Sequence, residues 1–182
     1  GSRWEPSGEP PVIRQWTMAD LLGDLKSASQ SKSFLAGKQA LLTASCLKCR
    51  RIHAAGGQVG PDLTQVGKRF DRRALLESIL LPSKVVDPKY SHTAYLMTNG
   101  KSIVGRPINV NQYHIVVETN PLTEETETVE RENIEEAVRT KTSPMPSGLV
   151  NILTRQQILD LLTYLQTGGD PEHPLYADPD SS

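Results

Sequence analysis

The sequence predicts a mainly α-helical fold with a β insertion, which is an α+β arrangement. Apolar residues recur at helical spacing in the first half of the chain and again near its end. Between these parts, from about residue 90 to 138, short alternating runs are separated by turn residues, as in a small antiparallel sheet. Neither helical part can bury its apolar face alone, so we expect one domain over residues 16–167 with the sheet inserted at about 90–138.

The composition is that of a globular protein without a membrane span. The chain has 182 residues and a net charge of -1, so we expect no nucleic acid or anionic membrane as a partner. No apolar run approaches the length of a bilayer span. Only 5% of the residues are aromatic, so a large buried cofactor could supply part of the core.

Both ends of the sequence predict extended segments. Gly1-Ser2 resembles the remnant of a cleaved tag, and three prolines in residues 1–15 predict a linker. The end is rich in proline and aspartate, so we expect a flexible tail over residues 168–182.

Three helices are expected before the sheet. WTMADLLGDLK (16–26) predicts a short helix with Thr17 as N-cap and Asp20 three residues later. Residues 31–49 predict a second helix that ends in the motif CLKC. RRALLESILL, from about residue 72, predicts a third, with Asp71 as N-cap and Pro82 as its stop.

The sheet and the last helix follow. Asn99-Gly100 lies between two apolar runs and predicts a hairpin turn. YHIVVET (113–119) and TETVER (126–131) predict two more strands, and NIEEAV (133–138) a strand or a short turn. RQQILDLLTYLQ has one broad apolar face and is expected to form a helix, with Thr154 as its N-cap.

Cys46 and Cys49 form a C-x-x-C pair. On one helical turn this spacing places both sulfurs on the same side, as the two vinyl groups of a c-type haem require. The spacing also occurs in local disulfides, free thiols, redox pairs and metal sites. A histidine directly after the second cysteine normally ligates the haem iron, but this chain has Arg50 there.

Met145 lies between Pro144 and Pro146 in SPMPSGL (143–149). Two prolines stiffen the backbone and remove two N–H donors, which disfavours a helix or a strand. The arrangement suits a thioether that must stay at one point, so we interpret Met145 as an iron ligand. A methionine that fills a gap in the core is the alternative.

Several motifs occur in a specific order along most of the chain. They are CLKC (46–49), GGQVGPDLTQVGKRF (56–70), LLESILLPSKVVDPKY (75–90), TNG (98–100), SPMPSGL (143–149) and LTRQQILDLLTYL (153–165). In these motifs, residues 31–167 resemble the bacterial haem-binding c-type cytochrome domains of the Pirellula/Verrucomicrobium type. The resemblance implies a cytochrome c-like helical core with a small antiparallel sheet before the methionine loop. It also implies electron transfer and a periplasmic or otherwise extracytoplasmic location.

The resemblance also implies roles for individual residues. Cys46 and Cys49 would hold haem c, and Met145 would be the distal iron ligand. The carbonyl of Pro61 would accept a hydrogen bond from the proximal ligand, and Arg69 is a candidate partner for a haem propionate. The expected apolar lining of the haem pocket is Leu63, Leu75, Ile79 and Leu149.

Arg50 departs from this pattern, because a guanidinium has no lone pair for iron. Three arrangements remain open. His53, one helical turn further on, takes over as the proximal ligand after the backbone unwinds. Otherwise His92 or His114 serves, or the chain is a degenerate, haem-less interaction module that retained the surrounding fold.

Two other chemistries are alternatives to haem. Cys46, Cys49 and His53 could bind zinc or copper, and Met145 would favour Cu(I). A structural zinc needs a fourth protein ligand, and the sequence has no second Cys/His pair. A thioredoxin-like pair lacks its βαβ context.

No cluster of nucleophile and acid–base groups stands out, so we predict an electron carrier rather than an enzyme. Its partner would be an unidentified redox protein. A homodimer is a candidate assembly, because the edges of the sheet need cover.

Overall fold

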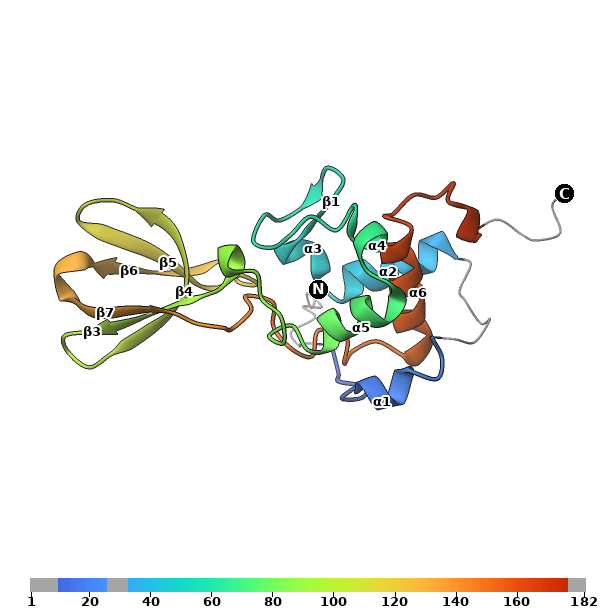
Figure 1. Cartoon of the computed structure of the whole chain (residues 1–182), viewed down its shortest axis with the longest axis horizontal. Helices are drawn as coiled ribbons and strands as arrows, with labels where there is room; N and C mark the ends of the chain where they lie inside the picture. The colour runs from blue at the N-terminus through green and yellow to red at the C-terminus, as the bar shows by residue number, and fades with distance from the viewer. Residues whose placement is uncertain (1–9, 26–32, 177–182) are drawn as a thin grey trace, which may run out of the picture.

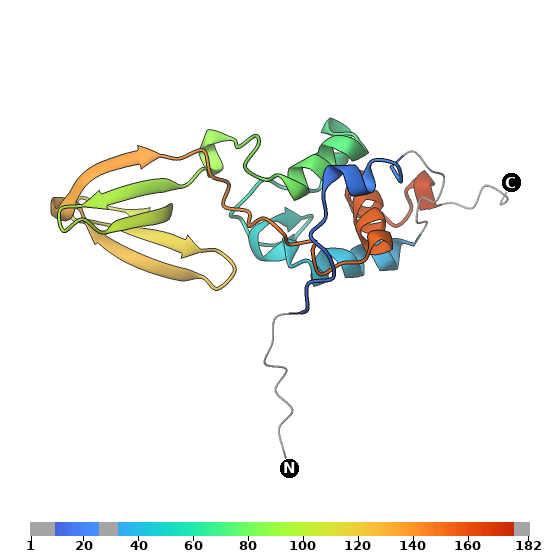
Figure 2. The same cartoon turned by 90° about the horizontal axis from the view of Figure 1, so that it is seen from below.

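The computed structural model describes residues 10–25 and 33–176, which form two lobes joined by two chain segments (Figure 1). A perpendicular view shows the same elongated arrangement (Figure 2). Residues 1–9 of the expected linker, 177–182 of the expected tail, and 26–32 between the first two expected helices lie outside the described residues.

The helical lobe combines three helices of two or more turns with several one-turn helices. Its elements are α1 (Met18–Leu21), α2 (Phe34–Thr43), α3 (Cys46–Cys49), β1 (Arg51–Ile52), β2 (Ala55–Gly56), α4 (Val66–Arg69), α5 (Arg72–Leu80), α6 (Arg155–Gln166) and η3 (Pro174–Tyr176). The expected caps are confirmed, because Thr17, Asp71 and Thr154 accept backbone hydrogen bonds at the starts of α1, α5 and α6.

Helix α6 is the centre of the helical core. Its buried residues pack with those of α1, α2 and α5, and α2 approaches closely enough that a Cβ at Gly37 would lie 2.7 Å from the Asp160 carbonyl oxygen. The fully buried side chains of this lobe are Leu21, Leu41, Leu76, Val150, Leu153, Ile158, Leu161, Leu162 and Thr163. Because so few long helices share one core, this lobe depends on close contacts at particular small residues.

Segments expected to be extended partly belong to this lobe. The backbone N–H groups of Ile13 and Arg14 donate to the carbonyl of Asn151, at 2.7 and 3.1 Å. The Tyr176 hydroxyl lies 3.1 Å from the Thr167 hydroxyl, and its ring packs edge-on against Phe34. The packed structure therefore continues past residue 167 as far as η3.

The β lobe is a five-stranded antiparallel sheet. Its elements are β3 (Thr93–Met97), β4 (Ser102–Val110), β5 (His114–Asn120), β6 (Glu125–Glu130), η2 (Arg131–Asn133) and β7 (Ile134–Arg139). The strand order is β6-β5-β4-β3-β7, and the predicted hairpin at Asn99-Gly100 joins β3 to β4. Gly100 has φ +81°, the left-handed conformation that glycine adopts without strain. The register of β4 with β5 shifts after Pro107, which has no N–H for the ladder.

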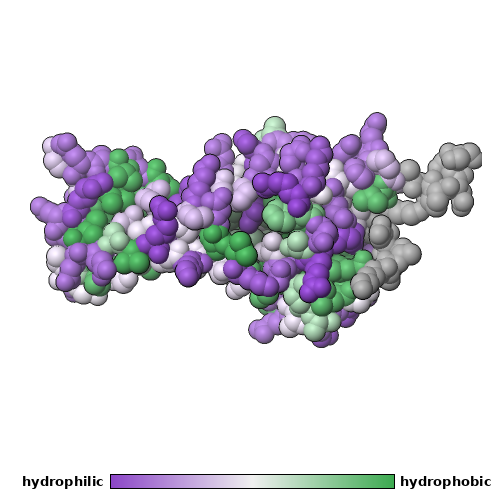
Figure 3. Space-filling model, viewed as in Figure 1, coloured by the Kyte–Doolittle hydropathy of each residue, from purple (hydrophilic) through white to green (hydrophobic). Residues whose placement is uncertain are grey.

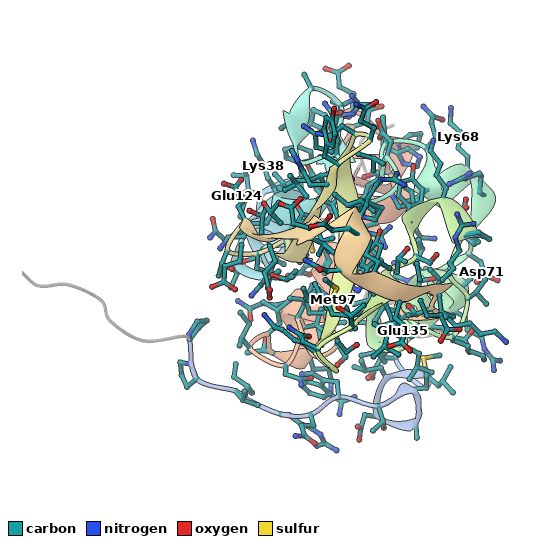
Figure 4. The ribbon with its side chains drawn as sticks, turned by 90° about the vertical axis from the view of Figure 1, so that its left-hand side faces the viewer. Lys38, Lys68, Asp71, Met97, Glu124 and Glu135 are labelled. Atoms are coloured by element: carbon teal, nitrogen blue, oxygen red, sulfur yellow. The ribbon has the colours of Figure 1, made fainter. Side chains whose placement is uncertain are left out.

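This lobe has a core of its own. Its buried side chains are Tyr95, Met97, Ile103, Ile115, Val117 and Val129. Viewed end-on, Met97 lies toward the middle of the lobe, while Glu124 and Glu135 lie on its outside (Figure 4). The alternation of inward apolar and outward polar residues explains why these segments form strands.

The predicted mainly α-helical class, a cytochrome c-like helical core with a small β insertion, is wrong. The chain has an α+β fold, in which the five-stranded sheet is a lobe with a separate core. Helices α2, α5 and α6 have 10, 9 and 12 residues, whereas α1, α3 and α4 are single turns of four residues each. The prediction failed because the periodic pattern could not show where helices break, or that the strands bury a core among themselves.

The two connecting segments, residues 81–92 and 140–154, run side by side between the lobes, and the second contains the methionine loop (143–149). His92 accepts from the Thr140 N–H at 2.9 Å, and its own N–H donates to Thr142 at 3.4 Å. The Ser143 N–H donates to Oγ of Ser83 at 3.1 Å. These bonds join the first segment, which contains η1 (Pro88–Tyr90), to the start of the methionine loop. Within the described ranges, no helix is long and apolar enough to cross a bilayer.

Candidate functional site

A cavity of about 330 Å³ lies where the connecting segments leave the helical lobe. It is lined by α3, the loop after β2, α4, α5, the segment between α5 and β3, and the methionine loop. Leu63, Leu75, Ile79 and Leu149, the expected pocket residues, all line it. Apolar surface is visible between the lobes (Figure 3), and Val85 of the first connecting segment is 87% exposed while also lining the cavity.

Cys46 and Cys49 lie in the cavity wall as free thiols. The expected helix over residues 31–49 is interrupted, because Ser45 has φ +56° and separates α2 from the single turn α3. This break gives the C-x-x-C turn its own direction. Burial raises the pKa of Cys46 to about 11 and also raises the pKa of Cys49, so both groups are neutral thiols at neutral pH.

Two glycines allow the following loop to cover α3. The N–H groups of Gly57 and Gly60 donate to the carbonyls of Leu47 and Cys49, at 2.8 and 2.9 Å. A Cβ at Gly57 would lie 2.4 Å from the Lys48 carbonyl oxygen, and one at Gly60 would lie 3.3 Å from Cγ of Arg50. The glycines of GGQVG therefore satisfy the end of α3 while leaving room for the Arg50 side chain.

Met145 reaches the same cavity from 96 positions after Cys49. Its backbone N–H donates to Oγ of Ser143 at 3.1 Å, and the Ser143 N–H is bonded to Ser83. The methionine loop is thus held against the other connecting segment by hydrogen bonds as well as stiffened by its prolines.

Arg50 extends into the cavity between the cysteines and Met145. Its Nη2 lies 3.5 Å from Sδ of Met145, and the thioether is a weak acceptor. Burial is the main cause that lowers the pKa of Arg50, and the neighbours that raise it are Cys46, Cys49 and Tyr90. No carboxylate among the described residues is an electrostatic neighbour of this guanidinium.

The carboxylates in and beside the cavity wall have other partners, and Glu118 of β5, whose charge acts on Cys49, pairs with Arg106 at 3.2 Å. Asp62 pairs with Arg51 at 3.1 Å and accepts from the Thr64 N–H, and Glu77 pairs with Lys84. Asp87 caps η1 by accepting from the Lys89 N–H at 2.9 Å. None of these carboxylates pairs with Arg50.

The other candidate site residues are divided between two places. Pro61 and Arg69 line the cavity, and Cζ of Arg69 lies 5.6 Å from the centroid of the Phe70 ring. His53 is exposed at the turn between β1 and β2, has φ +51°, and lines a different hollow with Phe34 and Tyr164. Its N–H donates to Oγ1 of Thr64 at 2.6 Å, so the structure does not bring His53 to the thiols.

The two remote histidines also lie outside the cavity wall. His92 is partly buried in the connecting segment, where burial lowers its pKa, and His114 bonds with Asn111 in the β lobe. In the described part of the chain, no three His, Cys, Asp or Glu side chains converge to hold an ion. The arrangement of Cys46, Cys49 and His53 as zinc or copper ligands therefore receives no support from this geometry.

Two features of the site were not predicted. Val85 and Tyr90 belong to the cavity wall, and the signal that could have found them is the pair Pro82 and Pro88, which keeps this segment out of a helix beside α5. The second is the inward direction of the Arg50 side chain, which local spacing cannot indicate.

The residues present fit a c-type haem in part. Two thiols, a thioether and an apolar wall are the groups that such a haem requires, and they meet at one cavity. The position after Cys49 supplies a guanidinium instead of a second ligand, and its Nη2 lies against the methionine sulfur. Arg50 would have to turn away from Met145 before that sulfur could bind iron.

No family model matches this chain, and a search of curated proteins finds no significant match.

Proposed function

We propose that this chain is a one-electron carrier that holds a c-type haem through Cys46 and Cys49, with Met145 as an iron ligand. The observation that carries the proposal is that these three sulfurs, from segments far apart in the sequence, line one cavity. A haem bound there would supply an iron centre that changes between two oxidation states. An extracytoplasmic location and a redox-protein partner are part of the same proposal.

The roles of the chain's own residues follow from their positions. The two thiols on α3 would anchor the group, and the methionine loop would hold the thioether at a fixed distance. The wall of Leu63, Leu75 and Ile79 would exclude water, which raises the potential of a thioether-ligated iron. Arg69 would bind a propionate at the edge of the cavity.

A second candidate function is a haem-less binding module. The contact between Arg50 and Met145 favours it, because both the sulfur and the space beside it are then occupied by the protein. In this case the cavity binds another ligand, and the β lobe provides a separate surface.

Intact mass and an absorption spectrum test the proposal. The chain is made in a host that attaches haem to secreted proteins, and we expect the mass of the polypeptide plus one haem, with a Soret band that survives acid–acetone extraction. A colourless protein with only the polypeptide mass rejects the electron-carrier function and leaves the haem-less module.

Two variants test the ligand assignment. Arg50→His restores an imidazole after Cys49, so we expect it to increase the haem content and to give a low-spin spectrum. Met145→Leu keeps the volume but removes the sulfur, so we expect it to shift the spectrum and lower the reduction potential. Met97→Leu, in the β-lobe core, is the matched control and should leave both unchanged.

A further inference from the structure

We propose that the cavity of the haem-free chain binds a small apolar ligand with a terminal carboxylate, and that Arg50 binds this carboxylate. This inference goes beyond the electron-carrier function, because it concerns the chain before or without haem attachment. It assigns a class of ligand to the cavity and a binding function to Arg50, the residue that stands where a histidine was expected.

The first argument is the unmatched charge of Arg50. A guanidinium carries five N–H donors and stays protonated, so burying it without an anion is costly. Here its Nη2 lies 3.5 Å from the Met145 sulfur, which is a weak acceptor. The thiols beside it are neutral. Of the wall carboxylates, Asp62 and Glu77 are paired with Arg51 and Lys84, and Asp87 caps η1 instead of pairing with Arg50. An incoming anion would therefore be the strongest acceptor available to this group.

The second argument is the chemistry of the remaining wall. Most of the cavity is lined by aliphatic and aromatic side chains, including Leu75, Ile79 and Leu165. Its volume of about 330 Å³ is at the small end of ligand pockets, which span roughly 300–1,000 Å³. A fatty acid of medium length has the matching parts: an alkyl chain for the wall, and a planar carboxylate that a guanidinium can bind with two parallel hydrogen bonds.

Arg50 is a better candidate for the carboxylate than the other cations at the cavity. Lys84 is paired with Glu77, and the guanidinium of Arg69 lies over the neighbouring Phe70 ring. The Arg50 side chain lies beside Gly60 and extends to the Met145 sulfur in the methionine loop. The ligand would thus place its carboxylate between α3 and Met145, with its alkyl chain along α5.

The test measures binding of octanoate and of 1-octanol by calorimetry, using full-length chain whose intact mass shows both cysteines unmodified. The two probes share a chain length and differ in charge. We expect the unaltered protein to prefer octanoate, and Arg50→Met to reduce octanoate affinity about tenfold or more while 1-octanol affinity falls little. The matched control is Arg51→Met, which removes the neighbouring exposed guanidinium and should leave both affinities unchanged.

Protection of the thiols locates the ligand. Octanoate should slow the alkylation of Cys46 by iodoacetamide in the unaltered protein and much less so in Arg50→Met. Arg50→Lys keeps the charge and serves if the methionine variant does not fold, and we expect it to retain part of the preference for octanoate. The proposal is overturned if octanoate does not bind, if its affinity is the same in Arg50→Met, or if only Arg69→Met reduces it.

Discussion

The helical lobe and the β lobe bury different kinds of groups. Around its cavity, the helical lobe brings together the buried thiol of Cys49 with the partly buried groups of Cys46, Arg50 and Met145. The core of the β lobe holds aliphatic side chains, one tyrosine and the thioether of Met97, and the lobe carries charged pairs such as Lys101–Glu127 on its surface. The comparison teaches that the groups able to bind a ligand line the cavity of the helical lobe, whereas the sheet of the β lobe buries mainly apolar side chains.

The largest expected effect on stability comes from a substitution in the core of one lobe, with hydrogen exchange measured in both lobes. Leu162→Ala removes a fully buried side chain of α6, and we expect it to lower the free energy of unfolding of the helical lobe by about 2–5 kcal/mol. Hydrogen exchange should accelerate in α2, α5 and α6 but not in β3–β5, because the two cores share no residue.

The matched variant is Val117→Ala in the β-lobe core. It should accelerate exchange in the strands and leave α6 protected. Equal acceleration in both lobes by either variant would contradict the separation and show a single cooperative unit.

The alkylation rate of the Cys46 thiol tests whether the cavity of the helical lobe buries it. At pH 8 we expect iodoacetamide to modify Cys46 roughly 10- to 100-fold more slowly in the folded, haem-free chain than in urea, because the folded pKa is about 11 and the ordinary value is 9.0. Quenched time points read by mass spectrometry give both rates.

The same pKa has a consequence for stability. Since the folded pKa lies above the unfolded one, folding favours the protonated thiol, and its contribution is complete below about pH 9 and lost as the pH rises toward 11. If iodoacetamide modified Cys46 as fast in the folded chain as in urea, the Cys46 thiol would not be buried against the cavity.

A glycine in each lobe gives the next comparison. Gly37→Ala should lower the free energy of unfolding by about 1–3 kcal/mol, because its Cβ would lie 2.7 Å from both the Asp160 carbonyl oxygen and the Tyr164 Cβ. Gly100→Ala meets no neighbour within 4 Å and should cost about 1 kcal/mol for its positive φ alone. Urea titration of both variants measures the difference, and a smaller loss for Gly37→Ala would contradict the close approach of α2 to α6.

The smallest expected effect concerns charges on the β lobe. Glu127→Gln breaks an exposed pair with Lys101 and should change the free energy of unfolding by less than about 0.5 kcal/mol. Glu118→Gln should cost more, because its pair with Arg106 is 12% and 27% exposed and therefore less screened. Repeating both urea titrations in 1 M salt should reduce the effect of Glu127→Gln most.

Part of the fold could be predicted because some signals are local. Asp71 and Thr154 cap helices through bonds to residues three positions away, and Asn99-Gly100 forms a turn through its own backbone preferences. The fold class could not be predicted in this way. Whether strands rest on a helical core or enclose their own depends on contacts such as Ile115 with its neighbours across the sheet, which no local pattern encodes.

The residues of the candidate site could also be singled out only where the signal is local. The spacing of Cys46 and Cys49 and the prolines around Met145 indicate chemistry without any structure. Sequence spacing also made His53 a candidate, but the left-handed backbone at that residue directs the turn away from the cavity.

By itself, then, the sequence determined the helix caps, the hairpin turn, the C-x-x-C spacing and the prolines on either side of Met145. Each of these features involves residues within a few positions of one another. Only the tertiary structure decided that Met145 shares a cavity with the thiols and that Arg50 extends into it without an acidic partner. The physical reason is that burial and charge pairing are set by side chains from distant segments, and those meet only when α3, α5 and the connecting segments pack together.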